Sequence, residues 1–275
     1  PIYPMYSRDS GNNSNWFFST PWATWVGAGS SDFGTAGNWS PASVPDANTR
    51  VLVEATNSLV VGAAASVREL ILGDGPGPAR ITVNALLSVG DDLTVRTNGT
   101  GVLNQPITVG QDVLILGGGT LTHSANAGTE QYRLTLSAGD LTVDPGARID
   151  VSQEGYGAGS GPGVSVDNVW GPSHGGQGAK NPGTVGAPTY GSIVAPTNMG
   201  SAGPHSANSE GGGSIALNVA GIATLSGSVR ADGGNRDGNC TGAGGSIWLT
   251  AADLAGAGSV AAEGGTAFAR GGGGG

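Results

Sequence analysis

The stretch "GGSIALNVAG" (residues 212–221) returns thirty-two residues later as "GGSIWLTAAD" (residues 244–253). In both copies a glycine pair and a serine precede alternating apolar residues. The longer copies, residues 212–234 and 244–265, align after a one-residue gap, and residues 134–155 have the same shape. Alternation with a period of two is typical of β-strands that bury one face. Each copy therefore predicts three short strands separated by corners of small residues.

A second repeat lies upstream, where "SVGDDLTV" (residues 88–95) matches "TVGQDVLI" (residues 108–115) at a spacing of twenty. Strands this short cannot each bury a face alone, but stacked coils of about twenty residues can. Gly, Asp and Asn at the corners supply the turn conformations that β-branched residues resist. The sequence therefore predicts an all-β fold, a right-handed parallel β-helix (β-solenoid). A β-sandwich is the alternative, because short strands and glycine-rich turns also suit it.

Composition divides the chain into four regions. Residues 1–50 form a Trp-rich N-terminal cap or tail, residues 51–154 form β-solenoid coils, residues 155–211 form a Gly/Pro-rich insert, and residues 212–275 form further coils with a glycine-rich end. The insert reads as a loop by composition. If its glycines are ordered, they need backbone hydrogen bonds with the solenoid flank, another subunit, or both.

The N-terminal tryptophans have three interpretations. The end of a solenoid exposes an apolar core and unpaired strand edges, so an aromatic-rich cap is the first. The second is an aromatic platform on which sugar rings stack, and the third is packing against a neighbouring subunit. The residues expected to make such glycan or subunit contacts are Trp16, Trp22 and Trp25.

Charge and composition exclude several classes of partner. The formal net charge is −9, which makes nucleic acid or an anionic membrane surface a poor partner. No apolar run is long enough to span a bilayer, so we expect no membrane insertion. The single cysteine, Cys240, excludes an intrachain disulfide framework. The chain begins at Pro1 without a basic and apolar leader, so we expect any export signal to have been removed or omitted.

Two columns of acidic residues follow from aligning the repeats. Asp92, Asp112, Asp140 and Asp253 fall at one corner, where Asp is expected to bond its local backbone. A second column precedes the glycine turns and contains Glu154, Asp232 and Glu263.

The segment "DGGNRDGN" (residues 232–239), next to the second column, concentrates oxygen ligands in a glycine-rich turn. Hard oxygen ligands suit Ca²⁺. The candidate ligands for Ca²⁺, the one cofactor that the sequence suggests, are Asp232, Asn235, Asp237, Asn239, Glu154 and Glu263. The alternative interpretation is an ordinary turn without metal.

No catalytic residue is predicted. His123 follows a strand, and His174 and His205 lie in the insert without a partner at metal-ligand spacing. No nucleophile elbow or phosphate-binding loop is found in a suitable context. A polysaccharide-acting β-helix enzyme, lyase or hydrolase, stays open as an alternative, because Arg148 and Arg230 align near the second acidic column.

Residues 25–53, "WVGAGSSDFGTAGNWSPASVPDANTRVLV", carry a resemblance to a known group. They resemble a module of bacterial secreted proteins in which a W-x-G…NWS-x-x-x-VP segment leads into β-helical repeats, as in autotransporter-like passengers and glycine-rich exoproteins. The matching residues are Trp25, Gly27, Asn38, Trp39, Ser40, Val44 and Pro45. The resemblance implies a secreted or cell-surface protein with a structural or adhesive role and no shared catalytic motif.

The sequence and the resemblance together predict a non-enzymatic structural protein. We expect an extracellular β-solenoid of a bacterial surface layer, adhesin or self-assembling filament, whose partners are copies of itself. Low surface charge supports self-association, because it would not repel a neighbour. A glycan-binding module with a polysaccharide partner is the remaining alternative.

Overall fold

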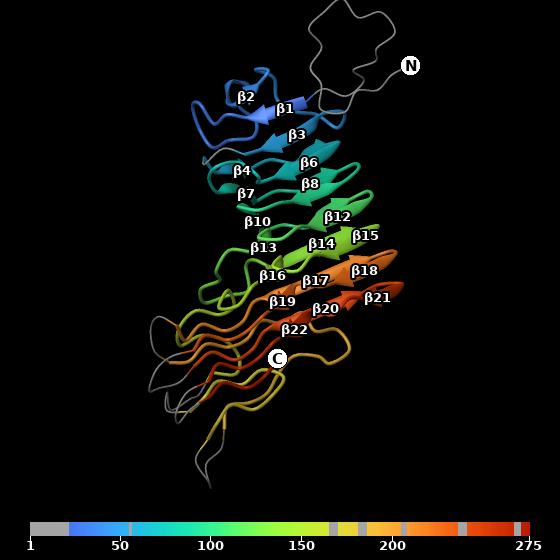
Figure 1. Ribbon diagram of the computed structural model, residues 1–275. Helices are drawn as coiled ribbons and strands as arrows, with labels where there is room; N and C mark the ends of the chain where they lie inside the picture. The colour runs from blue at the N-terminus through green and yellow to red at the C-terminus, as the bar shows by residue number, and fades with distance from the viewer. Residues whose placement is uncertain are drawn as a thin grey trace, which may run out of the picture.

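The chain is a stack of short parallel strands, seen in a computed structural model that describes residues 22–54, 57–164, 170–180, 186–204, 208–235, 241–266 and 271–275. Successive coils lie one below another in Figure 1, and each full coil supplies one strand to each of three sheets. The parallel β-helix predicted from the repeats is confirmed. Among the described strands only β1 and β2 pair antiparallel, which excludes a β-sandwich.

The strands form three sheets, in which neighbouring strands come from successive coils. The nine-stranded sheet contains β2 (Trp39–Ser40), β1 (Trp22–Trp25), β3 (Arg50–Val53), β6 (Glu69–Leu72), β9 (Leu93–Val95), β12 (Asp112–Ile115), β15 (Asp140–Val143), β18 (Ile222–Leu225) and β21 (Asp253–Ala255). The seven-stranded sheet contains β22 (Ser259–Ala261), β19 (Ser228–Arg230), β16 (Arg148–Asp150), β13 (Thr120–Thr122), β10 (Gly99–Leu103), β7 (Ala79–Val83) and β4 (Leu59–Val61). The six-stranded sheet contains β20 (Ser246–Thr250), β17 (Ser214–Val219), β14 (Leu134–Ala138), β11 (Ile107–Val109), β8 (Leu87–Val89) and β5 (Ala65–Val67). One 3-10 turn, Ala36–Asn38, precedes β2.

Apolar residues in register form the core. In one column the stacked side chains are Ala23, Val51, Leu70, Leu93, Val113, Leu141 and Ala223, all buried. Burying a Val or Leu side chain contributes about 1.5–3 kcal/mol, so the stack itself supplies the stability that single short strands lack. The spacing of twenty seen in the sequence is the pairing of Val89 with Val109 across adjacent coils.

Aromatic side chains close the N-terminal end of this core. Trp25, Phe33 and Trp39 are buried, and the ring of Trp39 packs edge-on against the other two at 5.0 and 5.2 Å. The 31–33 segment also bonds β4, where the Phe33 N–H donates to the Val60 carbonyl at 2.9 Å. Within residues 22–50 the cap interpretation fits. The solenoid nevertheless includes Trp22–Trp25, upstream of residue 51, because β1 pairs parallel with β3.

The described parts of the glycine-rich insert are not a free loop, because their backbones are hydrogen-bonded to the solenoid coils. Within residues 199–203, the Gly200 carbonyl accepts from the Tyr156 N–H, and the Gly200 N–H donates to the Gly212 carbonyl. The neighbouring Ser201 carbonyl accepts from the Ala243 N–H. One extended segment thus bonds three others, whereas a β-strand in a sheet has at most two neighbours.

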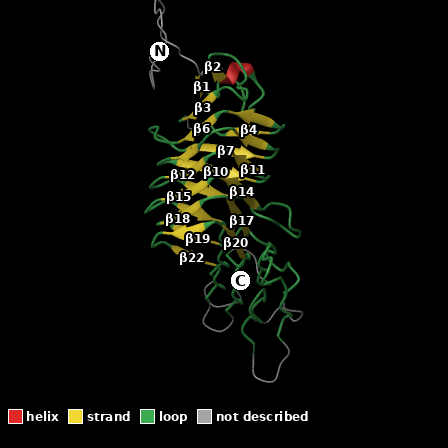
Figure 2. Ribbon diagram, turned by 90° about the vertical axis from the view of Figure 1, so that its right-hand side faces the viewer, coloured by secondary structure: helices red, strands yellow, loops and turns green. Residues whose placement is uncertain are grey.

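The same packing includes the glycine-rich ends of the last coils. Residues 242–245 exchange backbone hydrogen bonds with six other residues: Ser201, Gly212, Ala231, Gly234, Gly265 and Gly273. Extended chains that bond neighbours on several sides are typical of polyproline II-like packing, which has no internal hydrogen bonds of its own. We call this region, residues 155–164, 170–180, 186–204, 208–213, 231–235, 241–245, 262–266 and 271–275, the glycine bundle. It lies below the strand layers in Figure 2.

Glycine is required in the bundle for steric reasons. A Cβ atom on Gly211 would overlap the Gly200 carbonyl oxygen, and one on Gly242 would overlap the carbonyl oxygen of Glu210. Neighbouring backbones therefore approach more closely than any side chain allows.

No helix in the described part of the chain is long and apolar enough to cross a membrane.

Candidate functional site

The first acidic column is used to join coils. The Asp92 carboxylate accepts a hydrogen bond from the Asp112 N–H at 3.1 Å, and Asp140 accepts one from the Ile222 N–H at 2.7 Å. The predicted bonds to the local backbone are wrong for these two residues, because each carboxylate reaches the next coil. Ile222 also separates Asp140 from Asp253 in the register. The Asp253 carboxylate accepts a hydrogen bond from the adjacent Leu254 N–H at 2.8 Å, and the Asp253 N–H donates to the Gly221 carbonyl of the preceding coil at 3.3 Å.

The second acidic column is only half correct. Asp232 and Glu263 are adjacent, and the Glu263 N–H donates to the Asp232 carboxylate at 2.7 Å. Ser152, not Glu154, lies beside Asp232, whose N–H donates to the Ser152 hydroxyl. The predicted alignment is therefore wrong by two residues at Glu154. β16 pairs Asp150 with Arg230, and this register brings Ser152 level with Asp232.

The same register separates Arg148 and Arg230, the two arginines on which the alternative of a polysaccharide-acting enzyme depends. Arg148 pairs with Ser228, whereas Arg230 pairs with Asp150. The Arg230 guanidinium binds the Asp232 carboxylate, with Nε to Oδ2 at 2.6 Å. Both oxygens of Asp232 therefore already have protein partners.

The candidate Ca²⁺ ligands are only partly described. The Asn235 side-chain oxygen accepts from the Thr266 N–H at 2.7 Å, which joins two turns of the glycine bundle. Asp237 and Asn239 lie outside the described residues. Among the residues that are described, no three His, Cys, Asp or Glu side chains gather closely enough to hold a metal ion. Ca²⁺ binding at residues 232–239 stays a prediction.

Trp25 is not an exposed platform for sugars. Its side chain is 1% exposed, and its Nε1–H donates to the Asn57 carbonyl at 3.0 Å. The prediction of a glycan or subunit contact at Trp25 is therefore wrong, because the first core layer needs this ring. Trp22 is half-buried beneath the Arg50 guanidinium, 5.4 Å from the ring centre. Trp16 lies outside the described residues.

Two histidines are buried and have backbone partners. Nε2 of His123 accepts from the Ser214 N–H at 3.2 Å, so its Nδ1–H donates to the Ser124 carbonyl at 2.8 Å. Burial lowers the pKa of His123 to about 4, and the ring is neutral. Nδ1 of His174 lies 2.8 Å from the Gly244 carbonyl, and burial lowers its pKa as well. His205 and Cys240 are outside the described residues.

A polar cleft that the sequence did not predict opens beside β11 and β14. Its volume is about 290 Å³, and it is lined by Asn104, Gln105, Pro106, Glu130, Gln131, Tyr132, Arg133, Thr135 and Met199. Asn126 shapes the segment that supplies most of these residues, because its side-chain oxygen accepts from the N–H groups of Gln131 and Tyr132. Its amide group also donates to the carbonyls of Tyr132 and Glu154.

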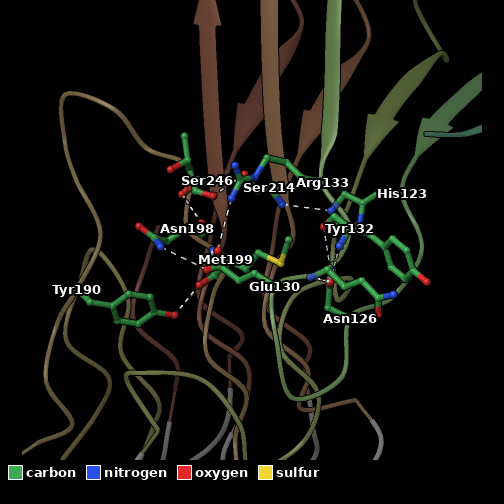
Figure 3. A network of polar contacts seen from close by, with 12 residues as sticks. His123, Asn126, Glu130, Tyr132, Arg133, Tyr190, Asn198, Met199, Ser214 and Ser246 are labelled. Atoms are coloured by element: carbon green, nitrogen blue, oxygen red, sulfur yellow. Dashed lines mark hydrogen bonds and ion pairs between the residues drawn. The ribbon is translucent and has the colours of Figure 1, made fainter. Parts of the chain in front are cut away.

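Glu130 joins this cleft to the glycine bundle. Its carboxylate accepts from the Met199 N–H at 3.2 Å and from the Asn198 amide at 3.3 Å. The Arg133 guanidinium lies 3.4 Å from the other carboxylate oxygen. Figure 3 shows these side chains meeting at the lower ends of the strands. The only sequence signal was the concentration of polar residues at 126–133 between two strands.

The cleft has the chemistry of a polar binding site. Amide, guanidinium and phenol groups can bond a neutral hydroxyl-rich ligand. Hydrolysis of a glycosidic bond normally takes two carboxylates on either side of the bond, and Glu130 is the only acid among the described lining residues. The arrangement therefore fits binding better than hydrolysis.

Comparisons with protein families, with curated proteins and with solved structures found no match to this chain. The resemblance to β-helical exoproteins therefore stays a prediction.

Proposed function

We propose that this chain is a non-enzymatic structural rod, a β-solenoid of an extracellular bacterial surface layer, adhesin or filament that associates with copies of itself. The single observation that carries the proposal is the use of the polar residues. A hydrolase or lyase site would need carboxylates that face a substrate. The carboxylates of Asp92, Asp140 and Asp232 instead accept hydrogen bonds that join one coil to the next.

Surface composition supports the same role. Only 11% of the residues are charged, so uncharged surface is available for contact between copies, although the net charge of −9 opposes their association at low ionic strength. The glycine bundle adds ordered backbone with few charges on one side of the solenoid. Such a surface suits close contact between neighbouring rods.

Electron microscopy of the purified protein, with and without a calcium chelator, tests this proposal. Regular filaments or layers are the expected result. Disassembly by the chelator alone would assign Ca²⁺ to the 232–239 turn. Dispersed single rods in both conditions, at concentrations of tens of micromolar, would rule out self-association.

A second function, glycan binding, is favoured by the Glu130 cleft. We propose a neutral saccharide unit as its ligand. Calorimetry with neutral oligosaccharides should show binding that Gln105→Ala weakens, whereas Gln111→Ala, at the next corner of the solenoid, leaves it unchanged. The absence of any heat with neutral glycans, while the protein is folded by circular dichroism, would remove this function.

A further inference from the structure

The six-stranded sheet differs from the other two sheets in the charge of its outer face. None of its described strands, β5, β8, β11, β14, β17 and β20, contains Asp, Glu, Lys or Arg. The other sheets carry charged residues in their strands, such as Glu69 and Asp112 in one and Arg80 and Arg148 in the other. Of the three outer faces, this one therefore suits an uncharged ligand, since a charged ligand would lose water without gaining a partner.

Two columns of outward side chains run across the strands of this face. They alternate along each strand with the buried residues of the core. The polar column has a hydroxyl or amide group in each coil: Ser66, Ser88, Thr108, Ser137 and Asn218. The apolar column lies two residues earlier in each strand: Leu86, Pro106, Thr135 and Ala216. Neighbouring strands are about 4.8 Å apart, which is close to the length of one sugar unit in an extended polysaccharide.

The face is open in the middle of the stack. Leu86 is 53% exposed, although β8 is paired with β5 on one side and with β11 on the other. Pro106 and Thr108 in the next coil are exposed as well. The strand backbones are hydrogen-bonded to one another, so a ligand on this face meets side chains alone. Hydroxyl groups can bond its hydroxyls, and the apolar column can pack against the C–H faces of its rings.

The Glu130 cleft is continuous with this face. Pro106 and Thr135 belong to the apolar column and also line the cleft. The cleft volume of about 290 Å³ is at the small end of the range for ligand pockets, so it holds a part of a larger ligand. The apolar column continues past the cleft to Leu86 on one side and to Ala216 on the other.

We propose that the cleft and the outer face of the six-stranded sheet together bind an unbranched, uncharged polysaccharide that runs across the strands, with about one sugar unit per coil. The cleft holds one unit, and the two columns hold the units on either side of it. A straight β-1,4-linked chain follows these columns, whereas an α-1,4-linked chain curls away from them. Such binding rests on the glycan-binding function proposed for the cleft and extends it to a longer ligand of defined linkage.

Oligosaccharides of glucose test the extended site by calorimetry on the unmodified protein. Cellobiose and cellopentaose are β-1,4-linked, and maltose and maltopentaose are the α-1,4-linked controls of the same lengths. Cellopentaose should bind at least about tenfold more tightly than cellobiose, because further units add contacts without a second cost of association. Maltopentaose should gain no such advantage over maltose.

A variant pair locates the extended site outside the cleft. Leu86→Asp places a carboxylate without a partner on the neutral face, and it should remove most of the advantage of cellopentaose over cellobiose. Val44→Asp makes the same change at an exposed apolar residue outside the strands, and it should keep the wild-type advantage. Circular dichroism checks that both variants fold, and the oligosaccharide series decides the question alone if either does not.

The outcomes separate the extended site from the cleft function. Binding of cellobiose that Gln105→Ala weakens, with no gain for cellopentaose, would overturn the extended site and leave glycan binding at the cleft. An equal gain for maltopentaose would overturn it as well. No binding of any of these sugars would remove both. A dimer by sedimentation that Leu86→Asp dissociates would also overturn the proposal, since a second copy would then occupy the face.

Discussion

The Asp140 carboxylate accepts a hydrogen bond from the Ile222 N–H at 2.7 Å, although 82 residues separate them in the sequence. The whole glycine-rich insert leaves the solenoid after β16 and returns before β17. Even so, β15 and β18 pair in register across it. The insert is therefore an excursion from a continuous stack, and the contact between Asp140 and Ile222 helps to fix where the stack resumes.

Removing this contact should destabilise the protein modestly. Asp140→Ala leaves the Ile222 N–H without its acceptor, and we expect a loss of about 1 kcal/mol in the free energy of unfolding. Asp140→Asn keeps an acceptor oxygen and should lose less than half as much. Urea unfolding measures both. Equal losses for the two variants would show that the hydrogen bond is not what Asp140 contributes.

Acid should destabilise the fold through His123. The unfolded chain binds a proton at this residue below about pH 6.5, whereas the folded chain does not until about pH 4, because burial disfavours the charged ring. Stability should therefore fall as the pH drops from 6.5 to 4, by up to about 3 kcal/mol. Arg133, which also lowers the pKa of His123, adds to the effect.

The measurement is the difference in urea unfolding between wild type and His123→Gln from pH 7 to pH 4. Gln can keep both hydrogen bonds but does not titrate in this range. The pKa values of Glu69 and Glu154 are raised by burial and give the opposite pH dependence, but both proteins contain them. Parallel curves for the two proteins would contradict the role of His123.

Side chains should not fit inside the glycine bundle. Gly211→Ala places a Cβ against the Gly200 carbonyl, and we expect a loss of about 1–3 kcal/mol, as for overpacking of a core. Gly128→Ala is the matched control, because nothing lies within 4 Å of its added Cβ. That variant should be neutral or slightly stabilising. If Gly211→Ala is as stable as Gly128→Ala by chemical denaturation, the bundle packing is refuted.

The aromatic cap should contribute to stability rather than to sugar binding. Trp39→Ala removes the contacts with Trp25 and Phe33 and the hydrogen bond from its Nε1–H to the Phe33 carbonyl at 2.8 Å. We expect a loss of about 3–5 kcal/mol by thermal or chemical unfolding. Val44→Ala, a truncation of an exposed residue in the same region, is the control. A stable Trp39→Ala protein would contradict the cap.

Periodic residues predicted the fold correctly, but not the contacts that depend on exact register. The alternation in Ile215, Leu217 and Val219 was sufficient to predict stacked strands, since only one face of each strand can meet a core. Glu154 was misplaced because the turn after β16 has a different length from its repeat partner. The predicted contact at Trp25 is wrong because composition does not distinguish a tryptophan ring buried in the cap from one exposed on the surface.

The glycine bundle could not be predicted from local patterns. Its stability depends on close backbone contacts among segments far apart in the chain, such as Tyr156 with Gly200 and Gly212 with Ala243. Glycine-rich sequence is equally typical of flexible linkers, so composition favoured a loop. The need for backbone partners was foreseeable, but not which partners they are.

The most direct test of this account is amide hydrogen exchange in the bundle of the purified protein. The N–H groups of Gly200, Gly211 and Gly242 all donate to backbone carbonyls. If the bundle is a folded part of the rod, these amides should exchange as slowly as those of β17, to which they are connected. Exchange at the rate of an unstructured chain, while β17 is protected, would show that residues 155–211 are a linker and that the account is wrong.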